Sequence, residues 1–454
     1  MINLVEKNKE YVVEIIDNGF EGEGIAKIDN FTIFINGAIK GEKVRVLIVK
    51  VLSSHGFGKV IEILEKSQAR QDVDCNTYKR CGGCNLRHVK YEETLKMKQN
   101  AVQSLVNKTL KNKLQIKETV GMENPLHYRN KAQYPIGINK KGEPVIGVFA
   151  NRTHEVIPID NCLIQNKKSE EIAKFIIEFI KEKNISIYDE KKGKGLVRHI
   201  VTKVGIKTGE IMCVIVINGH KIPNENELVE NLKTRYPEIK AIVKNINMKN
   251  TNVILGQENI NLYGNGYIED ILGEYKFKIS PLSFYQVNPV QAEKLYNLGV
   301  SMAEITKNDV VFDLYCGIGT ISLFMSKFAK KVYGIEIVEE AVKMAKENAQ
   351  NNNVSNTEFF AGDVEIVLDD LINNKGLKAD VVMFDPPRKG LDKKSIDNIL
   401  NIRPKKIVYI SCNPATLIRD LADFENEYDI KTIIPVDMFP FTSHVECVAT
   451  LQLK

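Results

Sequence analysis

The chain has 454 residues, of which 43% are hydrophobic and 27% are charged. A chain of this length is too long for one ordinary hydrophobic core, so we expect two or three domains. The formal charge of +5 is mild and fits ordinary surface lysines as well as nucleic-acid binding, so it indicates only a modest bias toward anionic partners. No apolar run approaches membrane-spanning length, which argues against an integral membrane protein.

The N-terminal stretch, residues 1–7, lacks a basic segment followed by an apolar one. We therefore expect no signal peptide and a cytoplasmic location. In that compartment the eight cysteines are expected to bind metal or act in catalysis rather than to form disulfides.

Residues 9 to about 65 read as short strands separated by glycine-bearing turns. The strand patterns include Tyr11–Ile16, Thr32–Ile35 and Val44–Val49. Short strands at even spacing predict a small barrel of the OB type. Such barrels often bind single-stranded nucleic acid, although many are only structural.

The composition changes after residue 67, and the middle of the chain mixes strands and helices. A polar helical pattern runs from Tyr91 to about Lys113. The strand patterns further on are Val145–Phe149, Ile200–Val204, Ile211–Ile217 and Ala241–Asn247. These patterns predict an α/β central domain.

From Val310 onward, strands and helices alternate. The expected strands are Val310–Leu314, Lys331–Glu336, Thr357–Phe360, Val381–Asp385 and Lys406–Ser411. This alternation predicts a parallel α/β sheet of the Rossmann-like kind. We expect three domains, at residues 1–66, 67–278 and 279–454.

A glycine-rich turn, residues 313–320, follows the first of these strands and opens a helix. Glu336 ends the next strand, 23 residues after Asp313, at the distance where an acid in a Rossmann-like site binds ribose hydroxyls. Asp363 follows the third strand and could reach an adenine amine. The alternative is a structural turn with a surface acid, but the strand–helix context favours a nucleotide-like pocket.

The ligand of this pocket is better matched by S-adenosylmethionine than by NAD. The dinucleotide fingerprint needs a third glycine for close approach to the pyrophosphate, and Thr320 and Ile321 follow Gly319 instead. S-adenosylmethionine has no pyrophosphate. Asp385, in Asp-Pro-Pro-Arg at the end of the fourth strand, is expected near the methionine end of the donor or near the substrate. A similar motif positions exocyclic amines in amino-group methyltransferases, which remains an alternative until Cys412 is considered.

Cys412 directly follows the fifth strand, in Ser-Cys-Asn-Pro, and so lies at the edge where ligands bind. A thiolate that adds to carbon 6 of uracil makes carbon 5 nucleophilic, and a general base must then remove the carbon 5 proton. We assign these roles to Cys412 and Glu446. Glu446 and His444 alternate along an expected strand and should face the same side, and burial would raise the Glu446 pKa. The alternatives are an inert buried thiol and a surface acid.

Three motifs together, Ser411–Thr416, Asp385–Gly390 and His444–Glu446, resemble the RNA uracil-5-methyltransferase family. The resemblance covers nearly the whole chain and is strongest to the branch that acts on 23S ribosomal RNA. It implies a nucleophile at Cys412, a base at Glu446 and an RNA-binding TRAM domain at the N-terminal barrel. It also implies that the helix near residues 91–113 packs on the catalytic domain.

The segment Ser280–Asn288 matches the family's entry into the catalytic domain. By resemblance, Phe284 packs on the flipped base. The positions that the resemblance assigns to the methyl donor are Gln286, Tyr315, Thr320, Glu336, Asp363 and Asp385.

Four cysteines form a candidate metal site: Cys75, Cys81, Cys84 and the distant Cys162. Four thiolates suit zinc or an iron–sulfur cluster, and spacing alone does not decide between them, although the isolated fourth cysteine favours a cluster. A radical mechanism is a further alternative, against which the spacing and the fourth cysteine both argue. The resemblance implies a [4Fe-4S] cluster.

The run His127–Lys131 combines cations with an aromatic residue. Arg129 and Lys131 would neutralise RNA phosphates and Tyr128 could stack on a base. The pair Arg198–His199 is a weaker candidate, and an ordinary basic loop is the alternative for both.

The sequence as a whole predicts S-adenosylmethionine-dependent formation of 5-methyluridine in 23S ribosomal RNA, with no membrane and no obligate protein partner. The first alternative is the same reaction on transfer RNA, against which the cysteines and the barrel argue. The second is a ribosome-assembly factor that binds RNA without catalysis.

Overall fold

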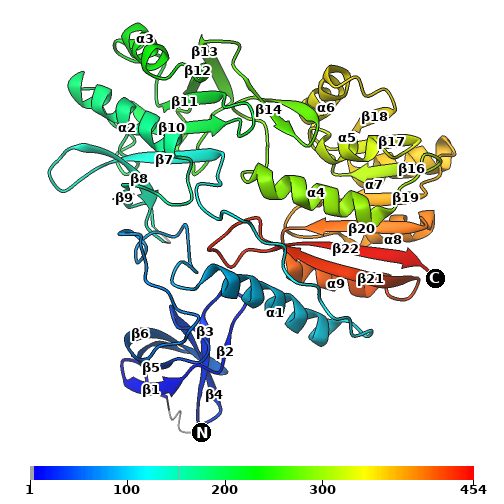
Figure 1. The fold of residues 1–454 in the computed structure, drawn as a ribbon. Coiled ribbons are helices and arrows are strands. Elements are labelled where there is room, and N and C mark those ends of the chain that lie inside the picture. Colours follow the sequence, from blue (N-terminus) through cyan, green and yellow to red (C-terminus); the bar gives the residue numbers. More distant parts are fainter. Residues whose placement is uncertain (1–4, 152) are drawn as a thin grey trace.

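The computed structural model describes residues 5–151 and 153–454. A small N-terminal barrel, a central mixed sheet and a C-terminal sheet flanked by helices follow one another along the chain (Figure 1). Residues 1–4, the start of the stretch from which no signal peptide is expected, lie outside the described part.

The barrel is a six-stranded sheet in the order β1-β5-β6-β4-β3-β2. Its strands are β1 (Glu10–Glu14), β2 (Asp17–Asn18), β3 (Gly24–Ile28), β4 (Phe31–Asn36), β5 (Lys43–Val51) and β6 (His55–Glu65). Alternate residues point inward, so Ile33, Val46 and Ile48 form its core. On β6 the inward positions Gly56 and Gly58 have no side chain, because Ile33 and Ile35 already fill the space.

Helix α1 (Tyr91–Thr109) leaves the barrel and lies against the C-terminal sheet. Its buried Val102 and Val106 belong to the same hydrophobic cluster as Leu417 and Ile418 of α9 (Pro414–Phe424). The helix ends four residues before the expected Lys113, because Leu110 adopts an extended conformation and joins that cluster. Helix α1, which precedes the central domain in sequence, thus completes the hydrophobic core of the C-terminal domain.

The central sheet has the strand order β13-β12-β11-β10-β7-β8-β9. Its strands are β7 (Lys131–Ile138), β8 (Pro144–Phe149), β9 (Val156–Pro158), β10 (Val197–Val204), β11 (Ile211–Ile217), β12 (Ile239–Ile246) and β13 (Glu258–Tyr263). Alternate residues of β11 enter two different hydrophobic clusters, one with α2 (Lys167–Glu182) and α3 (Glu225–Arg235) and one with the C-terminal domain. Burial on both faces explains the unbroken apolar run of this strand.

A hairpin of β14 (Ile268–Leu272) and β15 (Tyr275–Ile279) precedes the C-terminal sheet, whose order is β18-β17-β16-β19-β20-β22-β21. Its strands are β16 (Val310–Leu314), β17 (Lys331–Glu336), β18 (Thr357–Ala361), β19 (Val381–Phe384), β20 (Lys406–Ser411), β21 (Tyr428–Val436) and β22 (Glu446–Leu453). The first five are parallel, and β22 is antiparallel to β20 and β21.

Helices cover both faces of this sheet. Clusters of buried side chains place α4 (Pro289–Ala303), α5 (Thr320–Ser326) and α6 (Glu339–Asn351) on one face. The other face carries α1, α7 (Val364–Asp369), a π-helical turn (Asp370–Asn374), α8 (Lys393–Ile402) and α9. The predicted Rossmann-like α/β domain with an N-terminal barrel and an α/β central domain is confirmed, and every strand pattern named above lies in or overlaps a strand of the structure.

Within the described ranges, no helix is both long enough and apolar enough to cross a membrane.

Candidate active site

Cys412 and Glu446 are brought together by the antiparallel pairing of β20 and β22. Ser411, the last residue of β20, pairs with Cys447. Cys412 directly follows Ser411 and Glu446 directly precedes Cys447, so the two residues flank this pair at the edge where the parallel strands end. Burial raises the pKa of the Cys412 thiol, and the negative charge of the nearby Glu446 raises it further.

Glu446 is only 4% exposed. Burial, with a smaller contribution from the negative charge of Asp385, raises the pKa of Glu446 to about 8. Burial likewise raises the pKa of Asp385 to about 7. The expected rise in the Glu446 pKa is therefore confirmed, and the carboxyl is suited to take a proton near neutral pH.

Cys412 is partly exposed, whereas Cys213, Cys316 and Cys447 are buried. Burial raises the pKa of each of these three thiols above its usual value, so their thiolates are disfavoured. This difference in exposure agrees with the assignment of the three as structural residues.

The glycine-rich turn between β16 and α5 forms a tight backbone loop. Tyr315, Gly317 and Gly319 all have positive φ, at 65°, 54° and 80°. Glu336, at the end of the neighbouring strand, accepts hydrogen bonds from the backbone N–H groups of Gly317 (3.1 Å) and Val338 (3.0 Å). The predicted acid thus lies directly beside the predicted loop.

Three further donor-binding candidates flank this loop. Tyr315 is partly buried and its hydroxyl lies 3.5 Å from that of Ser395. Thr320 is the first residue of α5, and Asp363 caps α7 by accepting a hydrogen bond from the Glu365 N–H at 2.9 Å. All three lie at the ends of β16 and β18, on the same edge as Glu336.

Exposed apolar residues at this edge were not predicted from the sequence. Ile337 is 63% exposed and Ile366 is 67% exposed, beside Glu336 and Asp363 respectively. Exposed branched side chains next to a polar loop suit the faces of a flat ring. In the sequence, the apolar Ile337 directly after Glu336 was the feature that could have indicated this contact surface.

Gln286 and Phe284 lie on the segment that enters the catalytic domain. Phe284 is 75% exposed, which leaves its ring free to contact a ligand. The segment is fixed from the central domain by Lys203, whose buried amine donates hydrogen bonds to the carbonyls of Ser280 (2.7 Å) and Ser283 (2.9 Å). Burial and the nearby Lys131 lower the Lys203 pKa to about 7.

Tyr296 of α4 is a second residue that the sequence did not indicate. It is buried, and the Gln286 side chain is close enough to lower its pKa slightly. Burial and the charges of Asp385, Glu446 and Asp313 raise its pKa. Tyr296 therefore lies near both Gln286 and the carboxyls of the site.

Two predictions about RNA-binding residues need correction. Tyr128 is 4% exposed and its hydroxyl donates to the Pro440 carbonyl at 3.4 Å, so it is not available to stack on a base. Arg198 and His199 are also buried, and Arg198 donates to the carbonyls of Asn247 and Lys249. Packing of β10 against both neighbours explains why this basic pair is not at the surface.

Arg129 and Lys131 are partly buried. Arg129 lies beside Cys84 and Cys162, and burial lowers the Lys131 pKa. Lys131 pairs with Lys203 across β7 and β10. A role of Arg129 and Lys131 in binding RNA phosphates stays a prediction.

His444 does not share a strand with Glu446, contrary to the sequence prediction. β22 begins at Glu446, and His444 lies in the turn before it, where its N–H donates to the Thr442 hydroxyl at 3.2 Å. Residues 444 and 445 have no strand partners, so the alternation expected for His444 and Glu446 does not apply.

The four candidate metal-binding cysteines are neighbours in space. Burial and the adjacent thiols of Cys162 and Cys81 raise the pKa of Cys84 to about 12. The Gly83 N–H donates to the Cys81 sulfur at 3.3 Å. In the described part of the chain, no three His, Cys, Asp or Glu residues are close enough to hold a single metal ion.

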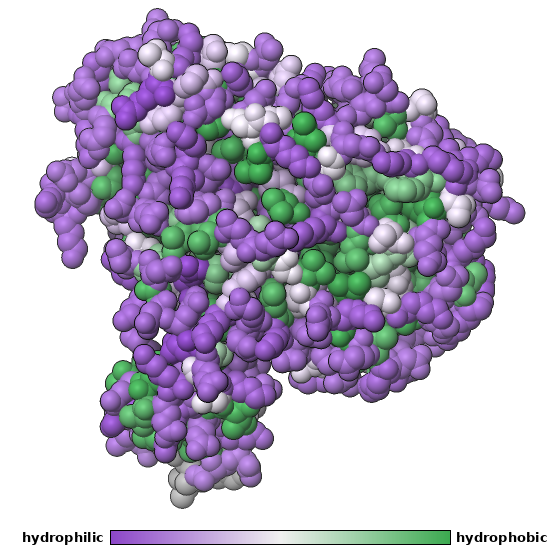
Figure 2. Space-filling model, viewed as in Figure 1, coloured by the Kyte–Doolittle hydropathy of each residue, from purple (hydrophilic) through white to green (hydrophobic). Residues whose placement is uncertain are grey.

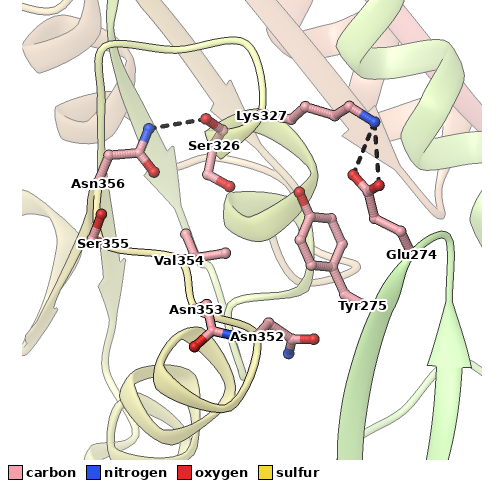
Figure 3. Close-up of a pocket in the computed structure, with 9 residues that line it drawn as sticks. All are labelled: Glu274, Tyr275, Ser326, Lys327, Asn352, Asn353, Val354, Ser355 and Asn356. Carbon is pink, nitrogen blue, oxygen red and sulfur yellow. Dashed lines mark hydrogen bonds and ion pairs between the residues drawn. The ribbon is translucent and has the colours of Figure 1, made fainter.

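A cavity of about 440 Å³ lies elsewhere on the catalytic domain (Figure 3). It is lined by residues 352–356, by Ser326 and by the ion pair of Lys327 with Glu274 (3.0 Å). These residues precede β17 and β18, so the cavity is at the edge of the sheet opposite Cys412. None of the predicted site residues lines it.

The carboxyl edge therefore combines a half-buried thiol with four carboxyls: Asp313, Glu336, Asp385 and Glu446. Burial, together with the charges of Asp385 and Glu336, raises the pKa of Asp313 to about 7. Carboxyls held in this way are electrostatically complementary to a cationic ligand. The sulfonium of S-adenosylmethionine is such a cation.

Comparison with known proteins agrees with this arrangement. A family model described as tRNA (Uracil-5-)-methyltransferase matches residues 90–454, and a TRAM domain model matches residues 4–61. A protein of Clostridium acetobutylicum named as an uncharacterized RNA methyltransferase is 49% identical over 452 residues, which cover 99% of this chain and 98% of that protein. A similarly named protein of Staphylococcus aureus is 43% identical over 454 residues, which cover 100% of both.

Among solved structures, the Pyrococcus abyssi tRNA (uracil-54, C5)-methyltransferase in complex with S-adenosyl-L-homocysteine superimposes with a TM-score of 0.77 at 26% identity. The match covers 97% of this chain and 99% of that one, so it includes the barrel as well as the catalytic domain. The chain belongs to the family of S-adenosylmethionine-dependent RNA uracil-5-methyltransferases and carries an N-terminal TRAM domain.

Proposed function

We propose that this protein forms 5-methyluridine in 23S ribosomal RNA through a covalent adduct between Cys412 and carbon 6 of the target uracil. The observation that carries the proposal is that Cys412 and the buried Glu446 flank the paired residues Ser411 and Cys447 at the carboxyl edge, close enough for the charge of Glu446 to raise the Cys412 pKa. A nucleophile and a base on one face are what uracil carbon 5 chemistry requires.

In this mechanism the Cys412 thiolate adds to carbon 6 and carbon 5 becomes enolate-like. S-adenosylmethionine, when bound, supplies the methyl group that carbon 5 takes. Glu446 then removes the carbon 5 proton, the double bond reforms and the Cys412 sulfur leaves. The pKa of about 8 makes Glu446 a stronger base than an exposed carboxyl.

The donor is proposed to lie between the glycine turn and the acids. Glu336 would bind the ribose hydroxyls and Asp363 the adenine, with Tyr315 and Thr320 beside them. Gln286 and Asp385 would hold the methionine end. The family membership and the acidic, cation-complementary edge both support this placement.

The outer face of the barrel offers an RNA-binding surface. Phe34 on β4 and Phe57 on β6 are paired neighbours with ring centroids 5.9 Å apart, and His55 contacts both rings, at 5.4 and 5.2 Å. Lys50 pairs with Phe57, and Lys59 is two residues further along β6; both lysines are exposed. Aromatic rings for base stacking and cations for phosphates together suit single-stranded RNA. Figure 2 shows hydrophobic residues exposed on this barrel.

The choice of ribosomal over transfer RNA rests on the cysteine set and on the sequence resemblance. The barrel does not support it, because the Pyrococcus abyssi transfer-RNA enzyme matches this chain across 97% of its length. Transfer RNA therefore stays the first alternative, and both RNAs belong in the test.

The four cysteines are proposed to hold a [4Fe-4S] cluster. Each thiolate in such a cluster binds a different iron atom, so the four sulfurs do not need to converge on one point. Among the described residues no such group of side chains could hold a metal ion, so the proposal is carried by the neighbouring thiols and by the sequence resemblance. The Arg129 guanidinium beside Cys84 and the N–H donor on Cys81 would stabilise the charge of the thiolates.

We further propose that residues 1–66, 67–278 and 279–454 act as RNA-binding, cluster-bearing and catalytic units. A cytoplasmic location and activity without an obligate protein partner complete the proposal.

The test is release of tritium from 23S ribosomal RNA that carries carbon-5-tritiated uridine, in the presence of S-adenosylmethionine. Wild type and Cys412→Ala are compared, and transfer RNA labelled in the same way is the parallel substrate. Release from ribosomal RNA by wild type only is the expected result.

Release from transfer RNA alone would assign the protein to the alternative substrate. If wild type releases tritium from neither RNA while it binds both donor and RNA, the protein acts as a binding factor and the catalytic proposal fails. Equal release by Cys412→Ala would refute the covalent mechanism.

A further inference from the structure

Residues 437–445 join β21 to β22 and lead directly into Glu446, the first residue of β22. We call this segment the strap. In Figure 1 it is the red loop that projects from the edge of the sheet toward α1. Much of its anchoring comes from parts of the chain that precede the catalytic domain.

The first anchor is α1. The buried Lys98 amine donates to the Asp437 carboxylate at 2.5 Å and to the Phe439 carbonyl at 3.2 Å. The Tyr91 hydroxyl donates to the other oxygen of Asp437 at 2.8 Å. The start of the strap is thus bound to a helix from the N-terminal half of the chain.

The second anchor is the segment directly after Cys84. Asn85 accepts a hydrogen bond from the Ser443 N–H at 2.9 Å and donates to the Ser443 hydroxyl at 3.0 Å. It also donates to the carbonyl of Glu21 in the barrel at 2.7 Å. The Leu86 N–H donates to the Phe441 carbonyl at 2.9 Å. One amide side chain therefore links the barrel to a point three residues before Glu446.

The middle of the strap has a conformation that needs such support. Phe441 has a φ of 62°. This backbone conformation is unfavourable for an aromatic residue and is kept only where surrounding contacts hold it in place. The guanidinium of Arg87 lies 4.0 Å from the centre of the Phe441 ring, and the Tyr91 ring is 5.5 Å away. Arg87 is itself fixed by two hydrogen bonds to Asp74, at 2.8 and 2.6 Å.

We propose that Asn85 is a positioning residue for Glu446, which acts through the strap on the proton-removal step of the reaction. The inference rests on the proposed function. Cys412 follows β20 and the donor loop follows β16, so neither belongs to the strap. Displacing the strap should therefore slow the step that uses Glu446 and leave adduct formation and methyl transfer intact.

The experiment is a single-turnover reaction with the RNA that wild type methylates, carrying carbon-5-tritiated uridine, and with methyl-labelled S-adenosylmethionine. Methyl incorporation, tritium release and protein–RNA complexes that survive denaturation are measured together. For Asn85→Ala we expect methyl incorporation near the wild-type rate, tritium release slowed roughly ten- to a hundredfold, and accumulation of the covalent complex. A role in folding alone would lower all three signals together.

Two variants are controls. Asn85→Asp keeps an acceptor for the Ser443 N–H, so it should recover much of the release rate. Asn124→Ala removes another exposed asparagine, whose side chain accepts a hydrogen bond from Leu126 within its own loop, and it should behave as wild type. Iron content is measured for each variant in parallel.

Release by Asn85→Ala at the wild-type rate, or an equal loss of methyl transfer and release without a covalent complex, would overturn the inference. Loss of iron in Asn85→Ala relative to wild type would assign the effect to the cysteines and overturn it as well. Absence of methyl transfer by wild type on both RNAs would instead refute the proposed function, and the inference with it.

Discussion

Replacing Glu446 by glutamine tests the base directly. The side chain keeps its size and loses the ability to accept the carbon 5 proton. Removal of a general base typically slows the step it serves by roughly 10²- to 10⁴-fold. Because the methyl has already been transferred at that point, the expected result for Glu446→Gln is a methylated RNA that remains covalently attached to Cys412.

The rate of tritium release by the wild type should also depend on pH, by an amount that follows from the Glu446 pKa. A carboxyl with a pKa of about 8 is ionised in roughly one molecule in ten at pH 7 and in half of the molecules at pH 8. Tritium release should therefore rise roughly fivefold across this interval when proton removal limits the rate. In Glu446→Gln the residual release should lose this dependence.

The same substitution has a consequence for stability. Raising the carboxyl pKa from 4.5 to about 8 makes its ionisation in the folded protein more costly than in the unfolded chain by on the order of 5 kcal/mol. The folded state keeps the proton while the unfolded state has lost it, so this group destabilises the fold progressively as pH rises from 4.5 to about 8. A buried amide left without partners costs about 1–3 kcal/mol, which offsets part of the gain on substitution.

Two measurements check this reasoning: denaturing gels of reaction mixtures for the covalent complex, and urea unfolding at about pH 5 and about pH 9. Glu446→Gln should be more stable than wild type at the higher pH and should lose that advantage at the lower one. Wild-type tritium release by Glu446→Gln would refute its assignment as the base. Equal stability differences at both pH values would refute the raised pKa.

Three other predictions concern the donor, the cysteines and the barrel. Asp313 and Asp385 both have a pKa raised to about 7, so they are neutral below this pH and negative above it. The affinity for cationic S-adenosylmethionine, measured by titration calorimetry, should rise from about pH 6 to about pH 8, whereas the affinity for neutral S-adenosylhomocysteine should change little. An equal dependence of both affinities on pH would contradict a sulfonium site at these acids. Cys84→Ser should reduce bound iron and the visible absorbance of the purified protein, and unchanged iron would exclude Cys84 as a ligand. Phe57→Ala should weaken binding of single-stranded RNA by about 1–3 kcal/mol, measured by fluorescence anisotropy, whereas Ile138→Ala, which removes an exposed apolar residue of the central domain, should not.

Features that depend on local sequence patterns were predictable from the residues alone. Strand periodicity located the five parallel strands, and the glycine turn, Glu336 and Cys412 were each placed at a strand end by their immediate neighbours. The parallel arrangement then brings these strand ends to one edge. For the same local reason, the helix that begins at Tyr91 was predicted within a few residues of its end.

Contacts between segments that are distant in the sequence became visible in the folded structure. The proximity of Cys412 and Glu446 depends on β22 entering the sheet antiparallel beside β20, and the link from Asn85 to Ser443 joins positions 358 residues apart. Burial was equally invisible in the sequence: Tyr128 and Arg198 looked like surface RNA contacts and proved to be packed inside. The local order of residues indicates which secondary structure each segment forms. Burial and contacts between segments depend on the packing of the whole chain, so no short stretch of residues encodes them.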